Sequence, residues 1–370
     1  MRVLLASSSY PANESDWKSV FIRNQIDALA RLGDMQLSVW APPGILPRKV
    51  SRATDKHDED WLNRLMARGG IAHLLRKRPL LGIGAATSLL RLMRRAFARS
   101  EAEIFHVNWL QNALALPHDG RPALITALGT DMQLLRIPGV RVMIRNKLKG
   151  RAAAICPNAD WMLPPLQAAF GDYADVRCVP FGIEECWYSM QRSFELNPRP
   201  KWLCVTRLTA GKVGPLFDWT APYFESGQAE LHLLGPMQER IKLPSWVRWH
   251  GPVSPEQLQA TWFPQAHGLI TLSQHPEGRP QVMLEALASG LPIVASRLPA
   301  HQDLLGDGEG GVLVDSPEGA LAALRALADP VANRALGLRG RACMLAEIGT
   351  WDDCAGRYVA LYRQLHGHAR

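Results

Sequence analysis

Short apolar runs alternate with segments of helical spacing along the chain, and this alternation occurs twice. In the first half, continuous apolar runs predict buried strands at residues 3–6, 37–40, 104–107, 123–128 and 153–156. In the second half, runs of the same kind predict strands at residues 202–206, 231–234, 247–249, 269–272, 293–295 and 312–314. Apolar residues between the runs recur at helical spacing, as Ile22, Ile26 and Leu29 do before Gly33. The pattern predicts two α/β domains with parallel sheets.

A polar, irregular stretch separates the two halves. The alternation pauses near residues 180–182, and we expect residues 191–200 to form the linker. The predicted architecture is an N-terminal domain over 1–185, a second domain over 186–350 and a helix over 351–370 that crosses back to the first. Two Rossmann-like, doubly wound domains facing a central cleft form the simplest arrangement. Ligands of such sheets bind beyond the carboxyl ends of the strands.

The loop and helix after the fourth strand of the second half hold the most informative side chains. Gly278 lies in this loop, and Pro280 suits the start of a helix. A helix N-terminus at the strand ends offers free N–H groups and a positive dipole end, so it suits a diphosphate. Glu277 precedes this helix and Glu285 lies within it. Both carboxylates are therefore placed to accept hydrogen bonds from sugar or ribose hydroxyls.

Two cations follow the first strand of the second half. Arg207 stands at the end of this strand, and Lys212 stands in the loop after it. Two cations at the carboxyl end of a strand can clamp a diphosphate and stabilise it as a leaving group. Either residue alone also fits a solvated surface cation. The two glutamates downstream favour the clamp.

Both segments resemble motifs of the glycosyltransferase family 4 superfamily. Glu277 and Glu285 match its E-x7-E motif, and Arg207 and Lys212 match its Arg followed five residues later by Lys. The resemblance implies the GT-B fold, a nucleotide-diphosphate sugar as substrate, retention of anomeric configuration and no metal ion or cofactor. It also implies that Glu277 contacts the donor sugar and Glu285 the ribose, with Arg207 and Lys212 at the diphosphate.

The same resemblance extends to other parts of the chain and implies further contacts. On the nucleotide side it adds Gly278, Arg279, Pro280, Gln281, Gly235, Gly251 and Ser9, and on the acceptor side it adds His106, Asn108 and Asp131.

Several positions depart from the family pattern. Leu128 replaces the His that often precedes the Gly-Thr-Asp turn, and Asn108 stands where a second His is common. Thr206 and Val213 replace glycines beside the two cations, and Ser19 stands near the usual Gly of the first loop. The nucleotide half of the pattern is better kept than the acceptor half.

Positive charge is concentrated in the first half of the chain. Residues 1–190 contain 25 Lys and Arg against 17 Asp and Glu, which accounts for the whole formal net charge of +8. Residues 61–100 contain nine basic residues and no acidic one. This asymmetry indicates an anionic partner for the N-terminal half. No recognised nucleic-acid module accompanies the charge, so we do not expect nucleic acid to be that partner.

A helical wheel over residues 88–99 separates basic from apolar side chains. The basic side contains Arg91, Arg94, Arg95 and Arg99, and the apolar side contains Leu89, Leu90, Met93, Ala96 and Phe97. With the basic residues 76–78 before it, this segment predicts an interfacial helix on an anionic membrane surface through residues 76–99. The alternative is a surface helix docked on its own sheet with solvated arginines.

The expected function is a retaining, metal-independent glycosyltransferase. It would move a sugar from a nucleotide-diphosphate sugar to a glycan or lipid-linked acceptor, in cell-surface polysaccharide or lipopolysaccharide synthesis. The N-terminus lacks the apolar core of a signal peptide, so we expect a cytoplasmic protein, peripheral on the inner face of the membrane. Residues 58–60, Asp-Glu-Asp, are interpreted as a solvated loop and not as a metal site.

Two alternatives to this function stay open. A nucleotide-sugar epimerase of the same fold would release nucleotide and sugar without an acceptor. A degenerate, non-catalytic glycan-binding subunit would bind without turnover, and Leu128 in place of His supports this alternative.

Overall fold

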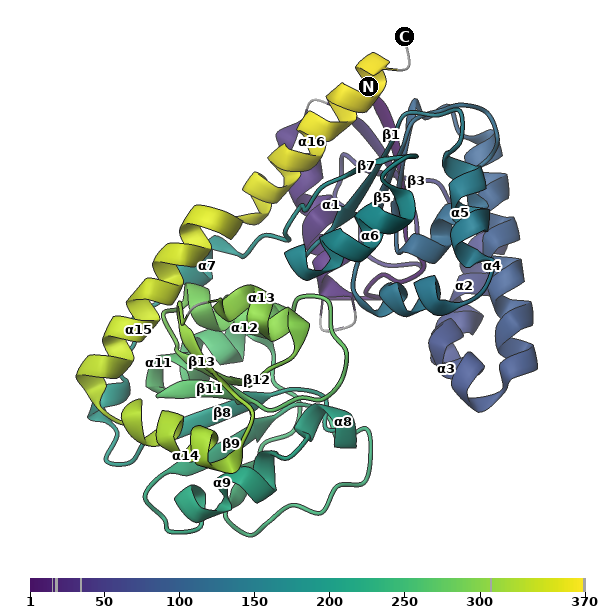
Figure 1. Ribbon diagram of the computed structural model, residues 1–370. Coiled ribbons are helices and arrows are strands. Elements are labelled where there is room, and N and C mark those ends of the chain that lie inside the picture. Colours follow the sequence, from purple (N-terminus) through teal and green to yellow (C-terminus); the bar gives the residue numbers. More distant parts are fainter. Residues whose placement is uncertain (15, 17–18, 34, 307, 369–370) are drawn as a thin grey trace. The chain divides into compact units, whose positions relative to one another are not determined.

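The computed structural model describes residues 1–14, 16, 19–33, 35–306 and 308–368 (Figure 1). The chain forms two compact units: unit 1 is Met1–Phe181 with Trp351–Arg370, and unit 2 is Gly182–Thr350. The division therefore follows Phe181, and residues 191–200 belong to unit 2. The predicted linker over these ten residues is wrong, because Arg192 donates hydrogen bonds to the carbonyls of Gly290 and Ala266 and fixes the stretch to unit 2.

Unit 1 contains a seven-stranded parallel sheet in the order β3-β2-β1-β4-β5-β6-β7. Its strands are β1 (Arg2–Ala6), β2 (Gln36–Trp40), β3 (Ser51–Arg52), β4 (Ile104–Asn108), β5 (Ala123–Ala127), β6 (Ala153–Pro157) and β7 (Asp175–Val176). The five predicted strands are all present. The two-residue edge strands β3 and β7 were not predicted, since two residues carry no periodicity.

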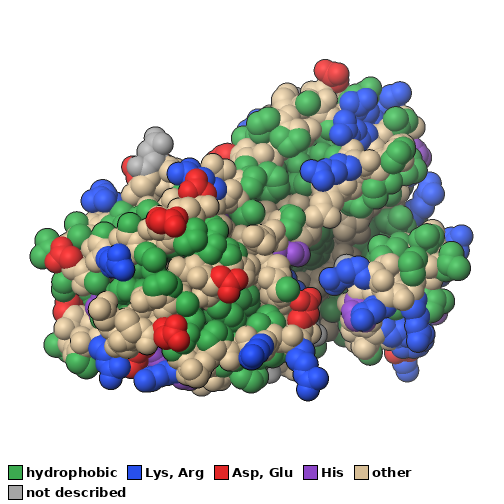
Figure 2. Space-filling view, turned by 60° about the horizontal axis from the view of Figure 1, so that its bottom comes forward, with side chains coloured by type: hydrophobic (Ala, Val, Ile, Leu, Met, Phe, Trp, Pro, Cys, Tyr) green, Lys and Arg blue, Asp and Glu red, His purple; other side chains and the backbone are tan. Residues whose placement is uncertain are grey.

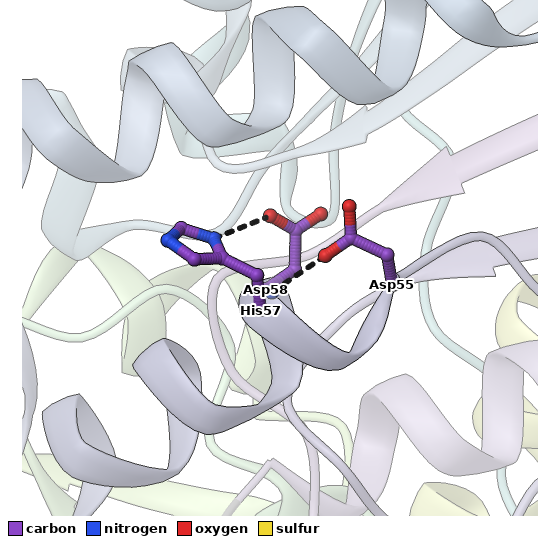
Figure 3. A group of neighbouring side chains, drawn as sticks. All are labelled: Asp55, His57 and Asp58. Atoms are coloured by element: carbon purple, nitrogen blue, oxygen red, sulfur yellow. Dashed lines mark hydrogen bonds and ion pairs between the residues drawn. The ribbon is translucent and has the colours of Figure 1, made fainter.

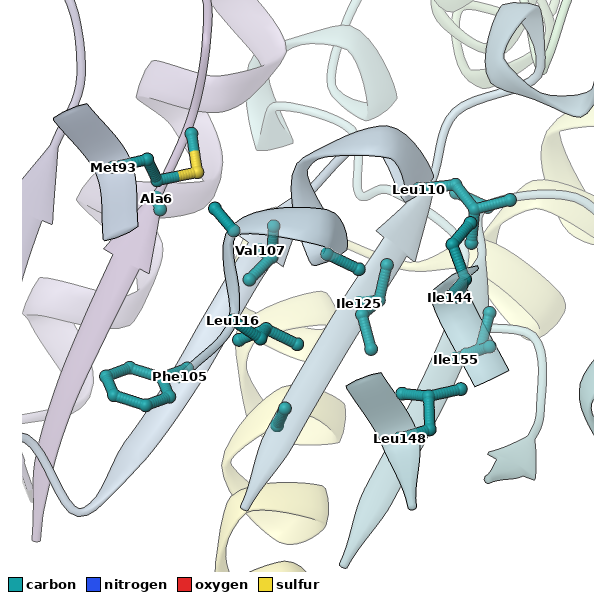
Figure 4. Packing of buried hydrophobic residues seen from close by; sticks show 14 of the residues in the cluster. Ala6, Met93, Phe105, Val107, Leu110, Leu116, Ile125, Ile144, Leu148 and Ile155 are labelled. Carbon is teal, nitrogen blue, oxygen red and sulfur yellow. The ribbon is translucent and has the colours of Figure 1, made fainter. Parts of the chain in front are cut away.

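Helices cover both faces of this sheet. They are α1 (Val20–Leu32), α2 (Lys56–Ala67), α3 (Gly70–Lys77), α4 (Pro79–Arg99), α5 (Val140–Leu148), α6 (Leu163–Phe170) and α16 (Trp351–His368), with short 3-10 turns η1 (Leu110–Ala115) and η2 (Thr130–Arg136). In the core on one face of the sheet, Met93 of α4 lies beside Ala6 of β1, Ile144 and Leu148 of α5 lie beside Ile155 of β6, and Phe105, Ile125 and Ile155 are fully buried (Figure 4).

The opposite face of the unit 1 sheet is covered by α1 and α16. Ile22, Ile26 and Leu29 of α1 are fully buried there, as are Tyr358 and Tyr362 of α16. Because α16 is the last helix, the chain returns to unit 1 after completing unit 2 (Figure 1). The predicted return of the C-terminal helix to the N-terminal domain therefore agrees with the fold.

Unit 2 repeats the architecture with six parallel strands in the order β10-β9-β8-β11-β12-β13. The strands are β8 (Lys201–Val205), β9 (Glu230–Leu234), β10 (Val247–Trp249), β11 (Gly268–Thr271), β12 (Ile293–Ser296) and β13 (Gly311–Val314). The helices are α7 (Glu185–Tyr188), α8 (Ala210–Val213), α9 (Leu216–Phe224), α10 (Pro255–Gln257), α11 (Phe263–Gln265), α12 (Gln281–Ala288), α13 (Pro299–Leu305), α14 (Pro317–Ala326) and α15 (Pro330–Cys343).

The strand order of each sheet reverses once. In unit 1 the chain runs outward from β1 to β3 and then from β4 to β7, so the reversal lies between β1 and β4. In unit 2 it lies between β8 and β11. Loops diverge above such a switch point and leave a crevice at the carboxyl ends of the strands, where ligands of doubly wound sheets bind.

Candidate functional site

The predicted clamp residues lie at the switch point of unit 2. β8 ends at Val205, which places Arg207 just beyond its carboxyl end with an exposed side chain. Thr209 caps α8 by accepting a hydrogen bond from the backbone N–H of Lys212 at 3.3 Å. This cap fixes the first turn from which the Lys212 side chain projects. Arg207 also lowers the pKa of Lys212, so the two cations lie within electrostatic range.

Lys212 and Glu277 form an ion pair in the structure. The Lys212 Nζ lies 2.5 Å from Glu277 Oε1, and the two side chains are only 13% and 14% exposed. Burial lowers the pKa of Lys212, and the Glu277 carboxylate opposes this effect. The sequence placed these residues at different parts of the donor, whereas the structure brings them into direct contact.

A chain of hydrogen bonds holds the loop that carries Glu277. Ser273 Oγ donates to Glu277 Oε1 at 3.2 Å and accepts from the backbone N–H of His275 at 3.1 Å. Ser296 Oγ donates to the Ser273 carbonyl at 2.6 Å. The His301 Nδ1 donates to the Ser296 carbonyl at 2.9 Å, which fixes the tautomer of this fully buried ring. Motif spacing gave no signal for Ser273, Ser296 or His301, because their contacts join separate strand ends.

The N-terminus of α12 lies in the same loop region. Pro280 is its N-cap, and no side chain of a described residue caps the helix, so the N–H groups of Gln281 and Val282 are available to an anion, whereas that of Met283 donates to the Pro280 carbonyl at 3.1 Å. The Gln281 side chain donates to the Gly182 carbonyl at 3.3 Å. The predicted helix start at Pro280 is therefore correct to one residue.

The Glu285 side chain, in the second turn of α12, has no hydrogen-bond or ion-pair partner among the described residues, whereas its backbone carbonyl accepts the Ser289 N–H at 3.0 Å. Its side chain is partly exposed. Burial, and next the Glu184 carboxylate, raise the pKa of Glu285 to about 8. An isolated carboxyl group in such surroundings is expected to accept hydrogen bonds from a ligand, because polar groups of this kind are normally paired.

Arg279 differs from its predicted role at the nucleotide. Its guanidinium forms an ion pair with Asp303 of α13, and the two side chains are only 4% and 6% exposed. The pair ties the loop before α12 to α13. The structure therefore gives the Arg279 side chain a positioning role in place of direct ligand contact. Gly278, beside it, is buried.

Comparison with known proteins identifies the part of the chain that carries this geometry. Residues 200–329 match the family described as glycosyl transferases group 1. This part of the chain is therefore similar to a group 1 glycosyltransferase domain. A D-inositol 3-phosphate glycosyltransferase from Streptomyces griseus is 32% identical over 140 residues, which is 37% of this chain and 29% of that protein. This chain thus matches less than a third of that relative's length. The predicted enzyme class is confirmed for this domain.

At the level of fold, solved structures are similar to the whole chain. A sucrose-phosphate synthase from Thermosynechococcus elongatus aligns over 100% of both chains, with a TM-score of 0.75 and 18% identity. An α,α-trehalose 6-phosphate synthase from Burkholderia multivorans aligns over 100% of this chain and 97% of its own, with a TM-score of 0.69 and 14% identity. The chain has the GT-B fold, as the sequence predicted.

Glycines of unit 2 allow close backbone approach at the switch point. Gly235 has φ 143°, and a Cβ atom there would lie 1.9 Å from the Thr206 carbonyl oxygen. Gly214 has φ 54°, and a Cβ atom there would lie 2.1 Å from the Leu272 carbonyl oxygen. The glycine expected directly after Lys212 is thus displaced by one position. Gly251, with φ 72°, accepts the Gly235 N–H at 2.7 Å and keeps the β9 and β10 loops together.

His106 in unit 1 does not occupy the acceptor-facing position that was predicted. Its ring is fully buried, with Nδ1 2.5 Å from Tyr362 Oη and Nε2 2.8 Å from Thr126 Oγ1. Burial lowers the pKa of His106 to about 3, so the ring is neutral. Both nitrogens are used within the core, and the structure gives His106 a packing role.

Asp131 is also structural in this arrangement. Its carboxylate accepts the backbone N–H of Leu110 at 2.9 Å and that of Leu128 at 3.0 Å, and it is 3% exposed. Burial raises the pKa of Asp131, and these backbone groups oppose the rise. Asp131 therefore fixes the loops after β4 and β5 instead of facing an acceptor.

A buried amide cluster lies at the switch point of unit 1 and contains the predicted Asn108. The Asn108 Nδ2 donates to Gln25 Oε1 at 3.0 Å, and Asn112 Nδ2 donates to Ser8 Oγ at 3.2 Å. Gln25 Nε2, Asn108 Oδ1 and Asn112 Oδ1 have no partner among the described residues. The cluster thus retains one donor and two acceptors for water or a ligand hydroxyl. Gln25 and Asn112 were not predicted.

The first loop of unit 1 places Ser9 next to Ser19. Their hydroxyl oxygens lie 2.6 Å apart. Ser19 has φ 56°, a left-handed conformation that glycine adopts more easily. Ser19 therefore occupies the backbone position for which the resemblance implied a glycine.

The predicted solvated loop at residues 58–60 is instead the first turn of α2. Asp55 caps this helix by accepting the Asp58 N–H at 2.8 Å, and His57 lies beside them (Figure 3). One atom able to bind a metal ion from each of Asp55, His57 and Asp58, a carboxylate oxygen or a ring nitrogen, lies within 4.8 Å of the other two. Asp58 accepts from Trp40 Nε1 at 3.0 Å and pairs with Arg95 at 3.2 Å. These carboxylates balance local cations and complete the helix cap.

Proposed function

We propose that this protein is a retaining glycosyltransferase that uses a nucleotide-diphosphate sugar and needs no metal ion. The observation that carries the proposal is the meeting of Arg207, Lys212, Glu277 and the α12 N-terminus at one switch point, beside the partnerless Glu285. The group 1 match over residues 200–329 supports the same donor class.

The charges of this site suit the departure of a diphosphate. When the bond between the anomeric carbon and the phosphate oxygen breaks, negative charge develops on the diphosphate. Arg207, Lys212 and the α12 amides are fixed positive groups that stabilise this charge without a cation. The acceptor oxygen bonds to the anomeric carbon on the face that the diphosphate leaves, and its proton passes to the departing phosphate oxygen.

The two glutamates divide the binding of the donor in this proposal. Glu285 accepts hydrogen bonds from the ribose hydroxyls. Glu277 accepts one from a sugar hydroxyl, and its contact with Lys212 couples sugar binding to the position of the cation. Glu285→Ala should therefore weaken binding of a free nucleoside diphosphate, whereas Glu277→Ala should mainly reduce sugar transfer. Equal loss of nucleotide affinity in both variants would contradict this division.

The acceptor is proposed to be a glycan or lipid-linked sugar of cell-surface polysaccharide or lipopolysaccharide synthesis, used at the inner face of the cytoplasmic membrane. The net positive charge of residues 1–190 supports an anionic acceptor or surface. The similar protein from Streptomyces griseus is named D-inositol 3-phosphate glycosyltransferase, and this name contains a phosphorylated, hence anionic, compound. The amide cluster at Asn108 offers hydrogen-bonding atoms for an acceptor hydroxyl.

Product analysis tests the proposal. The protein is incubated with UDP-, GDP-, ADP- and dTDP-sugars and a panel of acceptors, and products are identified by mass spectrometry and NMR. Transfer with retained configuration, lost in Lys212→Ala and kept in Lys242→Ala, is expected; Lys242 is an exposed lysine of unit 2. Release of free sugar without an acceptor would favour the epimerase. Nucleotide binding without any turnover would favour a glycan-binding subunit.

Chelation tests the absence of a metal ion from the mechanism. Activity should persist in EDTA, because Arg207, Lys212 and the helix N-terminus already face the developing charge. Complete loss that magnesium restores would contradict a metal-independent mechanism.

A further inference from the structure

The apolar side of the basic helix is not available to a membrane. Leu89, Met93, Ala96 and Phe97 of α4 are buried against the sheet of unit 1. The predicted insertion of this side into lipid is therefore wrong. Arg95 and Arg99 are also engaged, with Asp58 and Asp55.

The turn between α3 and α4 exposes a different apolar surface. Leu80 is 85% exposed, Ile83 55%, Leu81 54% and Leu75 41%. These four residues lie within nine positions at the tip of a helical hairpin (Figure 1). Gly82 lets the two helices approach closely, because a Cβ atom there would lie 2.6 Å from the Leu75 backbone nitrogen. The two helices are therefore in close contact beside the turn.

One outer face of α4 changes from apolar to basic along its length. At 100° per residue, Leu80, Ile83, Arg91 and Arg94 fall within about 80° of one another. All four are exposed, and Arg91 and Arg94 make no ion pair with a described residue. The rise of about 1.5 Å per residue places Arg91 roughly 16 Å along the axis from Leu80. Lys77 and Arg78 are also exposed, directly beside the tip.

Basic groups continue from α4 onto neighbouring segments. Burial lowers the pKa of Lys147, and Arg94 and Arg151 lower it further. Lys and Arg side chains gather beside hydrophobic ones on the lobe that contains α3 and α4 (Figure 2). Residues 61–100 contain no acidic side chain that would repel an anionic surface. None of the described helices is long and apolar enough to cross a membrane.

We propose that the α3–α4 hairpin tip (Leu75, Leu80, Leu81 and Ile83) inserts into the interface of an anionic lipid membrane, while Lys77, Arg78, Arg91 and Arg94 contact lipid phosphates. An apolar tip with basic residues behind it matches the two layers of a leaflet, acyl chains below and anionic headgroups above. The occupant is a lipid surface because the patch combines exposed, large aliphatic side chains with unbalanced positive charge.

Vesicle sedimentation tests the proposal without any substrate, so its outcome is independent of the proposed transferase activity. Vesicles of equal parts phosphatidylglycerol and phosphatidylcholine are compared with pure phosphatidylcholine. Wild type should bind the anionic vesicles more tightly, and salt should weaken binding. Leu80→Ser with Ile83→Ser should weaken it by about tenfold or more. Arg91→Gln with Arg94→Gln should weaken it about fivefold for each charge.

Matched variants separate insertion from general surface effects. Leu196 and Val331 of unit 2 are 85% and 78% exposed, so Leu196→Ser with Val331→Ser removes a similar apolar area elsewhere. This control should bind as wild type does, and all variants should keep the wild-type melting temperature. Equal binding of wild type and the Leu80/Ile83 variant would overturn the proposal. A change of oligomeric state in that variant, without vesicle binding by wild type, would instead assign the tip to contact between copies.

Discussion

Nucleotide binding is expected to release a proton from Glu285. Burial and Glu184 raise the pKa of Glu285 to about 8, so at pH 7 about nine tenths of these side chains are protonated. Ribose hydroxyls donate to the carboxylate form, so binding should bring the pKa back towards the ordinary value near 4.3. The proton must then leave as the nucleotide binds.

The size of the effect follows from this pKa. Below pH 8, each unit of decreasing pH should weaken nucleoside diphosphate binding by about tenfold through Glu285 alone. Glu285→Gln should remove this dependence, because the amide does not titrate. The same pKa makes the folded chain bind this proton more tightly than the unfolded chain does. The contribution of Glu285 to the free energy of unfolding should therefore decrease as pH rises from about 5 to 8.

Isothermal titration in buffers of different ionisation enthalpy measures the protons released. At pH 7, wild type should release about 0.9 proton more than Glu285→Gln on binding UDP. The phosphate groups of UDP titrate equally in both experiments, so the difference belongs to Glu285. Identical proton release by the two proteins would show that Glu285 does not ionise on binding and would remove it from the ribose site.

Four further substitutions test the clamp, the loop and the turn. Arg207→Ala and Lys212→Ala should each lower turnover about 10²–10³-fold, by analogy with loss of one oxyanion-hole donor, measured in steady-state kinetics. Arg279→Leu breaks the buried ion pair with Asp303 and should reduce stability by about 3–5 kcal/mol, on the order of 10 °C in Tm by calorimetry. Gly214→Ala forces a Cβ atom against a backbone carbonyl and should reduce the free energy of unfolding by about 2 kcal/mol or more in urea titration.

Each of these substitutions has a matched control. Arg240→Ala and Lys242→Ala remove exposed cations of unit 2 and should leave turnover unchanged. Asp303→Leu added to Arg279→Leu should recover part of the lost stability, and no recovery would argue against the ion pair as the cause. Gly211 has no atom nearer than 3.7 Å to an added Cβ, so Gly211→Ala should be tolerated. A similar loss in both glycine variants would refute the steric argument for Gly214.

The sequence predicted most of the fold because buried parallel strands leave a continuous apolar signal. Eleven strands were located to within a residue or two, and the motif residues Arg207, Lys212, Glu277 and Glu285 do lie at the unit 2 switch point. The Lys212–Glu277 contact was not predicted, since it joins helix α8 to a loop 65 residues further along the chain. The polar composition of residues 191–200 also did not indicate that these residues pack within unit 2.

Tertiary contacts changed the interpretation of several polar residues. His106 follows the apolar alternation of a strand, and only the structure shows Tyr362, 256 residues later, occupying one ring nitrogen. Similarly, Asp58 belongs to a polar run, yet the fold buries it against Trp40 and Arg95. Local sequence patterns carry no information about such long-range partners. The predicted roles of the acceptor-side residues therefore differed from the structure more than the predicted strands did.

The position of α16 in unit 1 has a consequence for synthesis. Residues 1–181 leave the ribosome first, but Tyr358 and Tyr362, which contact Thr126 and His106 in the unit 1 interior, are made after all of unit 2. An incomplete chain therefore holds a sheet face without one of its two covering helices and a His106 without the Tyr362 hydroxyl. Nascent chains arrested before residue 351 should remain protease-sensitive in unit 1. Protease protection of unit 1 should therefore appear only after α16 has been synthesised.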